Sequence, residues 1–107
     1  MKILLDESIP QKLRKDFTSE HEIWTVRDKG WLGKKNGELL RLLSDQGFDL
    51  FVTVDRKLPY QHKIENLTVP IIVMCAKDNR HQTLGALVPK IFKLLSQFPT
   101  SKILEVK

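Results

Sequence analysis

Short apolar runs and segments with apolar residues at helical spacing alternate along the chain. Apolar runs or alternating positions predict strands at residues 2–5, 21–26, 49–54, 70–76 and 102–106. Apolar residues at helical spacing predict helices at about residues 10–17, 36–46 and 84–98. Strands that alternate with helices indicate a parallel sheet covered on both faces. We therefore expect a single three-layer α/β domain over residues 1–107, with a mostly parallel five-stranded sheet.

Several residues mark where the predicted helices begin and end. Pro10 suits the first turn of the first helix, and Asn36 is a good N-cap for the second. Gly47 is expected to end the second helix, because glycine readily adopts the left-handed conformation found there. Pro89 lies inside the last helical pattern and is expected to kink or break that helix.

Acidic residues follow three of the predicted strands. Asp6 follows the first strand, Asp55 follows the third, and Asp78 and Asn79 follow the fourth. A strand order of 2-1-3-4-5 would place the first and third strands next to each other. Asp6 and Asp55 would then be neighbours at the point where the strand order reverses, which is where open α/β sheets bind ligands. Each aspartate taken alone is also typical of a turn or a helix cap, so the prediction depends on their convergence.

Metal binding is the chemistry that best fits converging carboxylates. Two carboxylates repel each other unless a cation lies between them, and hard oxygen ligands suit Mg²⁺ or Mn²⁺. A cation held in this way can polarise a phosphoryl oxygen, activate a water and stabilise the leaving group. The sequence therefore predicts phosphodiester hydrolysis. Glu38, in the first turn of the second predicted helix, is a further candidate acid, although the helix dipole alone favours an acid there.

Charge and composition narrow the partners and the compartment. The 107 residues carry a net charge of +5, and the pI is near 9.5, which favours polyanions such as nucleic acid. No apolar stretch reaches the roughly 18–20 residues that a membrane span needs, and no signal-peptide pattern is present. Cys75 is the single cysteine, so an internal disulfide is excluded. We therefore expect a cytoplasmic protein with no membrane partner.

Other conspicuous residues have ordinary structural explanations. Trp31 lies in a glycine-containing loop and suits either stacking on a nucleic-acid base or packing on the core, of which packing is the more common role. Cys75 lies in an apolar run and is expected to be a buried small hydrophobe. The histidines, His21, His62 and His81, lack the spacing of zinc ligands and are expected at the surface.

Two short motifs carry a resemblance to a known family. They are the opening Leu-Leu-Asp-Glu around Asp6 and the Thr-x-Asp that ends at Asp55. With them the chain resembles the small PIN-like proteins grouped as DUF5615, relatives of the Mut7-C and VapC-type PIN domains. Supporting matches cover nearly the whole chain and lie at residues 1–10, 25–31, 35–40, 51–55, 58–61 and 79–80.

The resemblance implies a PIN-like fold with an acidic ribonuclease site that depends on Mg²⁺ or Mn²⁺. By position, Asp6 and Asp55 match the family's first and third acids. The middle acid usually opens the second helix, where this chain has Asn36, which can bind a metal through its carbonyl oxygen but brings no charge. Glu38 lies one helical step further in, and the fourth position falls around Asp78-Asn79.

The same resemblance suggests partners for the chain. Proteins of this kind are often the toxin half of a toxin–antitoxin pair, so we expect RNA as substrate and a small antitoxin protein over the acidic cleft. A homodimer is also plausible. Basic residues near the rim of the site are expected to hold RNA phosphates, namely Arg27, Lys34, Lys35, Arg56 and Arg80.

Two other functions stay open from the sequence. Asn36 in place of an acid favours a degenerate PIN-like module that binds RNA or a protein without turnover. A receiver-like signalling domain also gathers acids at strand ends, but it needs a lysine after the fifth strand as well as an aspartate such as Asp55. The last predicted strand ends at Val106-Lys107, which disfavours this function.

Overall fold

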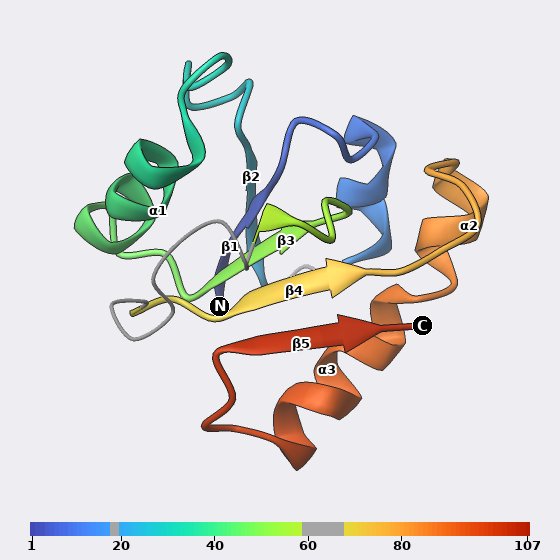
Figure 1. The fold of residues 1–107 in the computed structure, drawn as a ribbon. Helices are drawn as coiled ribbons and strands as arrows, with labels where there is room; N and C mark the ends of the chain where they lie inside the picture. The colour runs from blue at the N-terminus through green and yellow to red at the C-terminus, as the bar shows by residue number, and fades with distance from the viewer. Residues whose placement is uncertain (18–19, 59–67) are drawn as a thin grey trace.

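A computed structural model describes residues 1–17, 20–58 and 68–107 of the chain. Its centre is one sheet with the strand order β2-β1-β3-β4-β5, in which every pairing is parallel (Figure 1). The strands are β1 (Lys2–Leu5), β2 (Glu22–Thr25), β3 (Leu50–Thr53), β4 (Ile71–Met74) and β5 (Ile103–Val106). The predicted strands and their order are therefore confirmed, and the sheet is wholly rather than mostly parallel.

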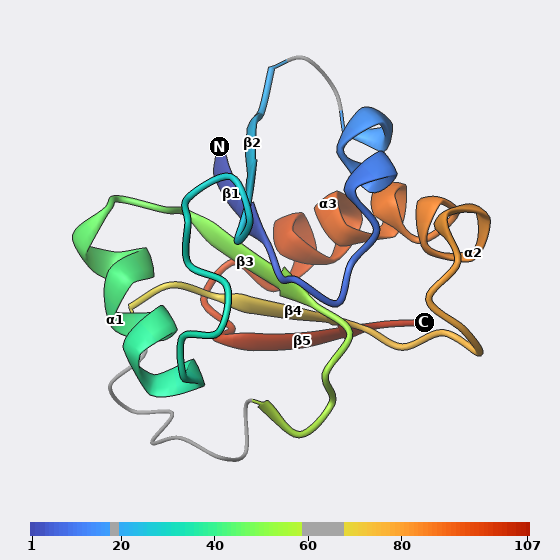
Figure 2. The ribbon, with the colours of Figure 1, turned by 90° about the horizontal axis from the view of Figure 1, so that it is seen from above.

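Helices cover both faces of the sheet. The described helices are the 3-10 helix η1 (Gln11–Asp16) and the α-helices α1 (Asn36–Asp45), α2 (His81–Gly85) and α3 (Val88–Gln97). Figure 2 shows α1 on one side of the sheet and α2 and α3 on the other, where η1 also lies. This is the predicted three-layer α/β architecture.

Each face of the sheet has its own core. Residues of η1, α2 and α3 pack on one face, and the buried members include Leu13, Leu84, Val88, Ile91, Ile3, Leu5, Val52, Ile72, Met74 and Val106. Residues of α1 and of the loop after β2 pack on the other face, and the buried members include Leu39, Leu43, Trp31, Phe48, Leu4, Phe51, Ile71 and Val73. Because both faces are covered, β3 and β4 are apolar runs that are buried throughout.

The first predicted helix is shorter and tighter than its apolar spacing suggested. It is a six-residue 3-10 helix that Pro10 precedes as N-cap, rather than an α-helix with Pro10 in its first turn. It ends where the Phe17 N–H donates to the Arg14 carbonyl, three residues back. Ile9, Leu13 and Phe17 are all buried at a spacing of four. The pattern therefore identified the buried positions but not the type of helix.

Two helix boundaries differ by small amounts from the prediction. The second helix begins at Asn36 itself, with Lys35 in the N-cap position, so the assignment of Asn36 as N-cap was wrong by one residue. The last helical pattern does break, as expected, but the break falls at residues 86–87, before Pro89. Pro89 lies in the first turn of α3, where its missing N–H costs no hydrogen bond.

The residues with open structural roles can now be placed. Trp31 is buried and packs edge-on against Phe48 with ring centroids 6.1 Å apart, so its core role is confirmed. His21 is stacked on Phe92 at 4.6 Å, and the prediction that it lies at the surface was wrong. His62 and residues 59–61 of the family resemblance lie outside the described residues. Cys75 is partly buried, with its thiol 3.8 Å from the Val73 carbonyl oxygen.

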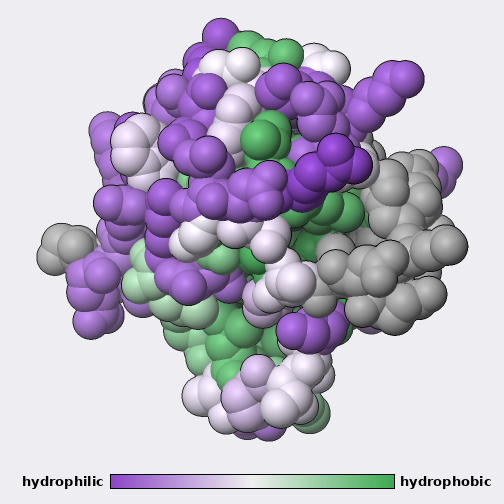
Figure 3. Space-filling view, turned by 90° about the vertical axis from the view of Figure 1, so that its left-hand side faces the viewer, coloured by the Kyte–Doolittle hydropathy of each residue, from purple (hydrophilic) through white to green (hydrophobic). Residues whose placement is uncertain are grey.

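The surface is strongly polar on the side that carries α1. Figure 3 shows hydrophilic residues over most of the upper half of this side, and apolar residues gathered lower down. Phe98, which follows α3, is among the large apolar side chains that stay exposed. Among the described residues, no helix has the length and apolar character that crossing a membrane requires.

Candidate metal centre

Asp6 is held at the junction of β1 and β3. Its backbone N–H donates to the Val52 carbonyl at 2.9 Å, which extends the parallel ladder one residue past the end of β1. Leu5 pairs with Thr25 on one side and with Val52 on the other, so Asp6 follows the central of three neighbouring strands. The residue is only 9% exposed. The fold therefore buries a carboxylate at the switch point, as the sequence predicted.

Three hydrogen bonds compensate the burial of the Asp6 carboxylate. Its Oδ1 accepts from the Glu7 N–H at 2.9 Å. Its Oδ2 accepts from the Ser8 hydroxyl at 3.2 Å and from the Thr53 hydroxyl at 2.7 Å. A buried charge is costly unless such donors replace water, so these contacts fix the orientation of the side chain.

A single hydroxyl connects Asp6 to Asp55. The Thr53 hydroxyl donates to Asp6 and accepts from the Asp55 N–H at 3.0 Å. The Asp55 Oδ1 in turn accepts from the Lys57 N–H at 2.9 Å, which closes a short turn after β3. Thr53 therefore links the Asp6 carboxylate to the backbone of Asp55, which follows the neighbouring strand.

Thr53 was not identified as a site residue from the sequence. It is fully buried at the end of β3, and a buried hydroxyl nearly always has a hydrogen-bond partner. A polar β-branched residue that ends an otherwise apolar strand, two residues before Asp55, is the signal that would have found it.

The other predicted acids have local partners. Glu38 accepts from the Lys34 ammonium at 3.2 Å, one helical turn away. The Asp78 Oδ1 accepts from the Arg80 N–H at 3.0 Å, and the Thr83 hydroxyl together with Arg80 holds the pKa of Asp78 below its ordinary value of 3.8. Asn79 is exposed in the same loop. Within residues 1–17, 20–58 and 68–107, no three or more His, Cys, Asp or Glu side chains gather closely enough to hold a metal ion.

Asp6 and Asp55 still meet the minimal requirement for Mg²⁺ or Mn²⁺. Such ions are commonly bound through one or two carboxylates, and water and substrate phosphate complete the shell. The described residues offer no hydrogen-bond donor to the Asp55 Oδ2, which leaves that oxygen for a ligand. The chemistry of these two side chains therefore fits a cation held by two carboxylates.

Basic residues surround the carboxyl ends of the strands. Arg27 follows β2, Arg56 follows Asp55, and Arg80 is the N-cap of α2. These three residues are exposed, as are Lys34 and Lys35 before α1. Lys34 is partly neutralised by Glu38, while the three arginines lie after strands of the sheet.

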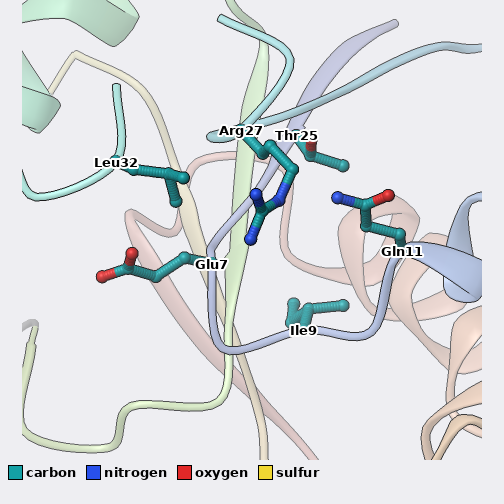
Figure 4. Close-up of a pocket in the computed structure, with 6 residues that line it drawn as sticks. All are labelled: Glu7, Ile9, Gln11, Thr25, Arg27 and Leu32. Atoms are coloured by element: carbon teal, nitrogen blue, oxygen red, sulfur yellow. The ribbon is translucent and has the colours of Figure 1, made fainter. Parts of the chain in front are cut away.

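A pocket of about 480 Å³ opens beside Asp6. Its lining residues come from the loop after β1, from η1 and from the end of β2 with the loop that follows (Figure 4). They are Glu7, Ile9, Gln11, Thr25, Arg27 and Leu32. The sequence had identified only Arg27 of this set.

An ion pair joins the elements that form this pocket. The Arg14 guanidinium on η1 pairs with Asp28, which follows β2. Asp28 also accepts from the Thr25 N–H at 3.0 Å, and its own N–H donates to the Thr25 hydroxyl at 3.0 Å. Burial alone would raise the pKa of Asp28, but the Thr25 hydrogen bonds and the Arg14 charge outweigh it and hold the pKa below 3.8. We call this set of contacts the Arg14–Asp28 brace.

His81 is not a plain surface histidine. Its Nε2 lies 2.7 Å from the Asp16 Oδ2, a contact that joins α2 to the end of η1. Gly85 lies directly beneath this carboxylate, since a Cβ there would come within 3.1 Å of the Asp16 Oδ2. His81 therefore lies at the surface, as predicted, and pairs there with Asp16.

Comparisons of the chain with protein-family models, with curated proteins and with solved structures found no match.

Proposed function

We propose that this chain is a metal-dependent ribonuclease, with Asp6 and Asp55 as ligands of Mg²⁺ or Mn²⁺. The observation that carries the proposal is the buried Thr53 hydroxyl, which contacts Asp6 and the Asp55 N–H from the end of a central strand. A protein gains little stability from holding two acidic residues together, because like charges repel. A cation between them would remove this cost.

The charge around the site supports RNA as the substrate. The chain carries a net charge of +5, and Asp6, the one buried carboxylate among the described residues, follows β1 at the edge of the sheet where exposed arginines follow β2, β3 and β4. Arg27, Arg56 and Arg80 each follow a strand at this edge of the sheet, and we expect them to contact the RNA there. The cation, when bound, would polarise the scissile phosphate and stabilise the leaving oxygen.

The remaining expectations belong to the same proposal. The resemblance of the Leu-Leu-Asp-Glu and Thr-x-Asp motifs to PIN-like proteins supports a role as the toxin of a toxin–antitoxin pair in the cytoplasm. An antitoxin would then cover the carboxyl edge of the sheet, and its acidic residues would meet the arginines there. Homodimerisation stays a prediction.

A second candidate is a PIN-like binding module without turnover. The observation that favours it is the pairing of Glu38 with Lys34, which leaves Asp6 and Asp55 without a third acid among the described residues. Such a module would bind RNA in a salt-dependent manner that EDTA does not change.

Calorimetric titration with Mn²⁺ tests the first proposal directly. We expect wild type to bind Mn²⁺ and Asp55→Asn to lose that binding while it keeps the circular dichroism spectrum of wild type. Asp78→Asn is the matched control, because it removes a strand-end acid that has only local partners. Purified wild type should then cleave single-stranded RNA in Mn²⁺, and Asp55→Asn should not.

The two candidates separate cleanly in this experiment. Wild type that binds no Mn²⁺ but binds RNA in EDTA would favour the binding module. Cleavage by Asp55→Asn at the wild-type rate would rule out this site altogether.

A further inference from the structure

The pocket beside Asp6 combines apolar walls with polar side chains that lack partners. Ile9 and Leu32 supply apolar surface, and Leu32 is 44% exposed although it is a large hydrophobic residue. Among the described residues, no hydrogen bond or ion pair reaches the side chains of Glu7, Gln11 or Arg27. Ligand pockets commonly have this composition, with volumes of about 300–1,000 Å³.

The pocket is lined by a negatively charged side chain, Glu7, and a positively charged one, Arg27. Figure 4 shows the Arg27 side chain extending between Glu7 and Leu32 on one side and Thr25 and Gln11 on the other. Glu7 supplies acceptors and Arg27 supplies a planar fork of donors. The described structure shows no ion pair between Glu7 and Arg27, so both stay available to a ligand.

Two contacts connect the walls of the pocket. The Arg14–Asp28 brace ties η1, which carries Gln11, to the loop that carries Arg27 and Leu32. The same loop is anchored by Trp31, which packs against Phe48 in the core. A preformed pocket loses little conformational entropy on binding, which favours a small, rigid ligand.

We propose that this pocket is a base-specific subsite that takes a guanine from single-stranded RNA. Guanine presents two adjacent N–H donors on its Watson–Crick edge, which match a carboxylate such as Glu7. It presents the O6 and N7 acceptors on the neighbouring edge, which match a guanidinium such as that of Arg27. Ile9 and Leu32 supply apolar surface for the faces of the ring, and unstacked RNA bases are bound in this way.

The other bases match the pocket less well. Adenine has a single exocyclic donor group and places an acceptor beside it, which a carboxylate would repel. Cytosine and uracil lack N7, and neither base combines two adjacent ring and exocyclic N–H donors with an acceptor pair on the neighbouring edge. The donor and acceptor pattern thus selects guanine.

The location of the pocket connects it with catalysis. Glu7 directly follows Asp6, so a base in the pocket would place its own phosphates beside the proposed metal site. The inference therefore rests on the proposed function for its biological meaning. Binding of the base itself needs neither a metal nor cleavage, and can be measured separately.

The test is a titration with guanosine 5′-monophosphate in EDTA, followed by amide chemical shifts in NMR. The other three nucleoside monophosphates serve as competitors. We expect the guanine nucleotide to bind about tenfold more tightly than the adenine nucleotide. Equal affinity for all four nucleotides, or no binding of the guanine nucleotide, would overturn the proposal.

Three variants locate the binding. Glu7→Gln should lower the affinity for the guanine nucleotide about tenfold and leave that for the adenine nucleotide unchanged. Leu32→Ala should lower the affinity for all four nucleotides. Glu22→Gln makes the same charge change at an exposed position on β2 and should have no effect on nucleotide binding. A Glu7→Gln variant that binds the guanine nucleotide as wild type does would contradict the assignment.

RNA cleavage separates this inference from the proposed function. If the guanine nucleotide binds through Glu7 but RNA stays intact in Mn²⁺, the subsite stands and the ribonuclease proposal fails. If RNA is cleaved at the same rate with and without guanine near the scissile bond, the ribonuclease proposal stands and the subsite fails.

Discussion

The ends of β1 and β3 differ from the end of β4, although acids follow all three strands. At the end of β4, Asp78 bonds only within its own loop and the start of α2. At the ends of β1 and β3, Asp6 bonds to Thr53, which is 47 residues away in the sequence. An acid after a strand is therefore not sufficient for a site. What distinguishes the two regions is a hydrogen bond between strands.

The two regions also differ in how far the carboxylate is removed from water. Asp78 is exposed enough that water can replace any lost partner, and its turn satisfies it locally. Asp6 is buried, so its donors cannot be replaced by water. Selection for turn geometry explains Asp78, but it does not explain why Asp6 is brought inside the protein.

Removal of the Asp6 carboxylate should have the largest effect on stability. Asp6→Ala leaves the buried Thr53 hydroxyl without its acceptor and removes three hydrogen bonds. We expect the free energy of unfolding in urea to fall by about 2–4 kcal/mol. Asp78→Ala is the control from the other region and should leave the unfolding midpoint nearly unchanged. Equal losses in the two variants would break the comparison.

Removal of the Thr53 hydroxyl should have the second-largest effect on stability. Thr53→Val keeps the shape of a fully buried side chain but deletes the donor to Asp6 and the acceptor for the Asp55 N–H. A loss of about 1–2 kcal/mol is expected, together with weaker Mn²⁺ binding in calorimetry. Thr83→Val deletes the matching hydroxyl beside Asp78 and should leave Mn²⁺ binding intact. If both valine variants bind Mn²⁺ as wild type does, Thr53 has no positioning role.

Asp28 should show an intermediate effect that depends on pH. Its pKa is lowered in the folded protein, so its stabilising contribution is fully present above 3.8 and is lost as the pH falls through the lower folded value. At neutral pH, Asp28→Asn should cost less than about 1 kcal/mol, because the pair with Arg14 is partly exposed. The difference from wild type should shrink in urea titrations below pH 3.8. A difference that stays constant down to the lowest pH would show that the charge of Asp28 contributes nothing.

Substitution of Glu38 should have the smallest effect on stability. Glu38→Gln removes an exposed ion pair with Lys34, which precedes α1 by two residues, and such a pair is worth about 0.2–0.5 kcal/mol. Mn²⁺ affinity in calorimetry should not change. A marked loss of Mn²⁺ affinity would instead join Glu38 to Asp6 and Asp55, and would restore the third acid that the family resemblance implies.

Local patterns in the sequence were enough to predict most of the fold. The apolar runs identify all five strands, and the alternation with helices predicts the parallel sheet. The strand order 2-1-3-4-5, assumed to bring the acids together, is the order observed. The prediction of helix type failed where more than one kind of helix would bury the same side chains. Ile9, Leu13 and Phe17 have the spacing of an α-helix, yet η1 is a 3-10 helix. The N-cap of α1 is Lys35, one residue before the predicted Asn36, and Lys35 makes no side-chain capping hydrogen bond.

What the sequence determined by itself is the set of buried positions and the placement of acids after strands. Burial follows from side-chain hydrophobicity, and its period reveals the type of element. Only the tertiary structure decided which acids share a partner, because hydrogen bonds depend on distances between residues far apart in the chain. It joined Asp6 to Asp55 through Thr53, and it placed Glu7 and Arg27 around one pocket. No local pattern encodes these contacts, since each arises when separate segments pack against each other.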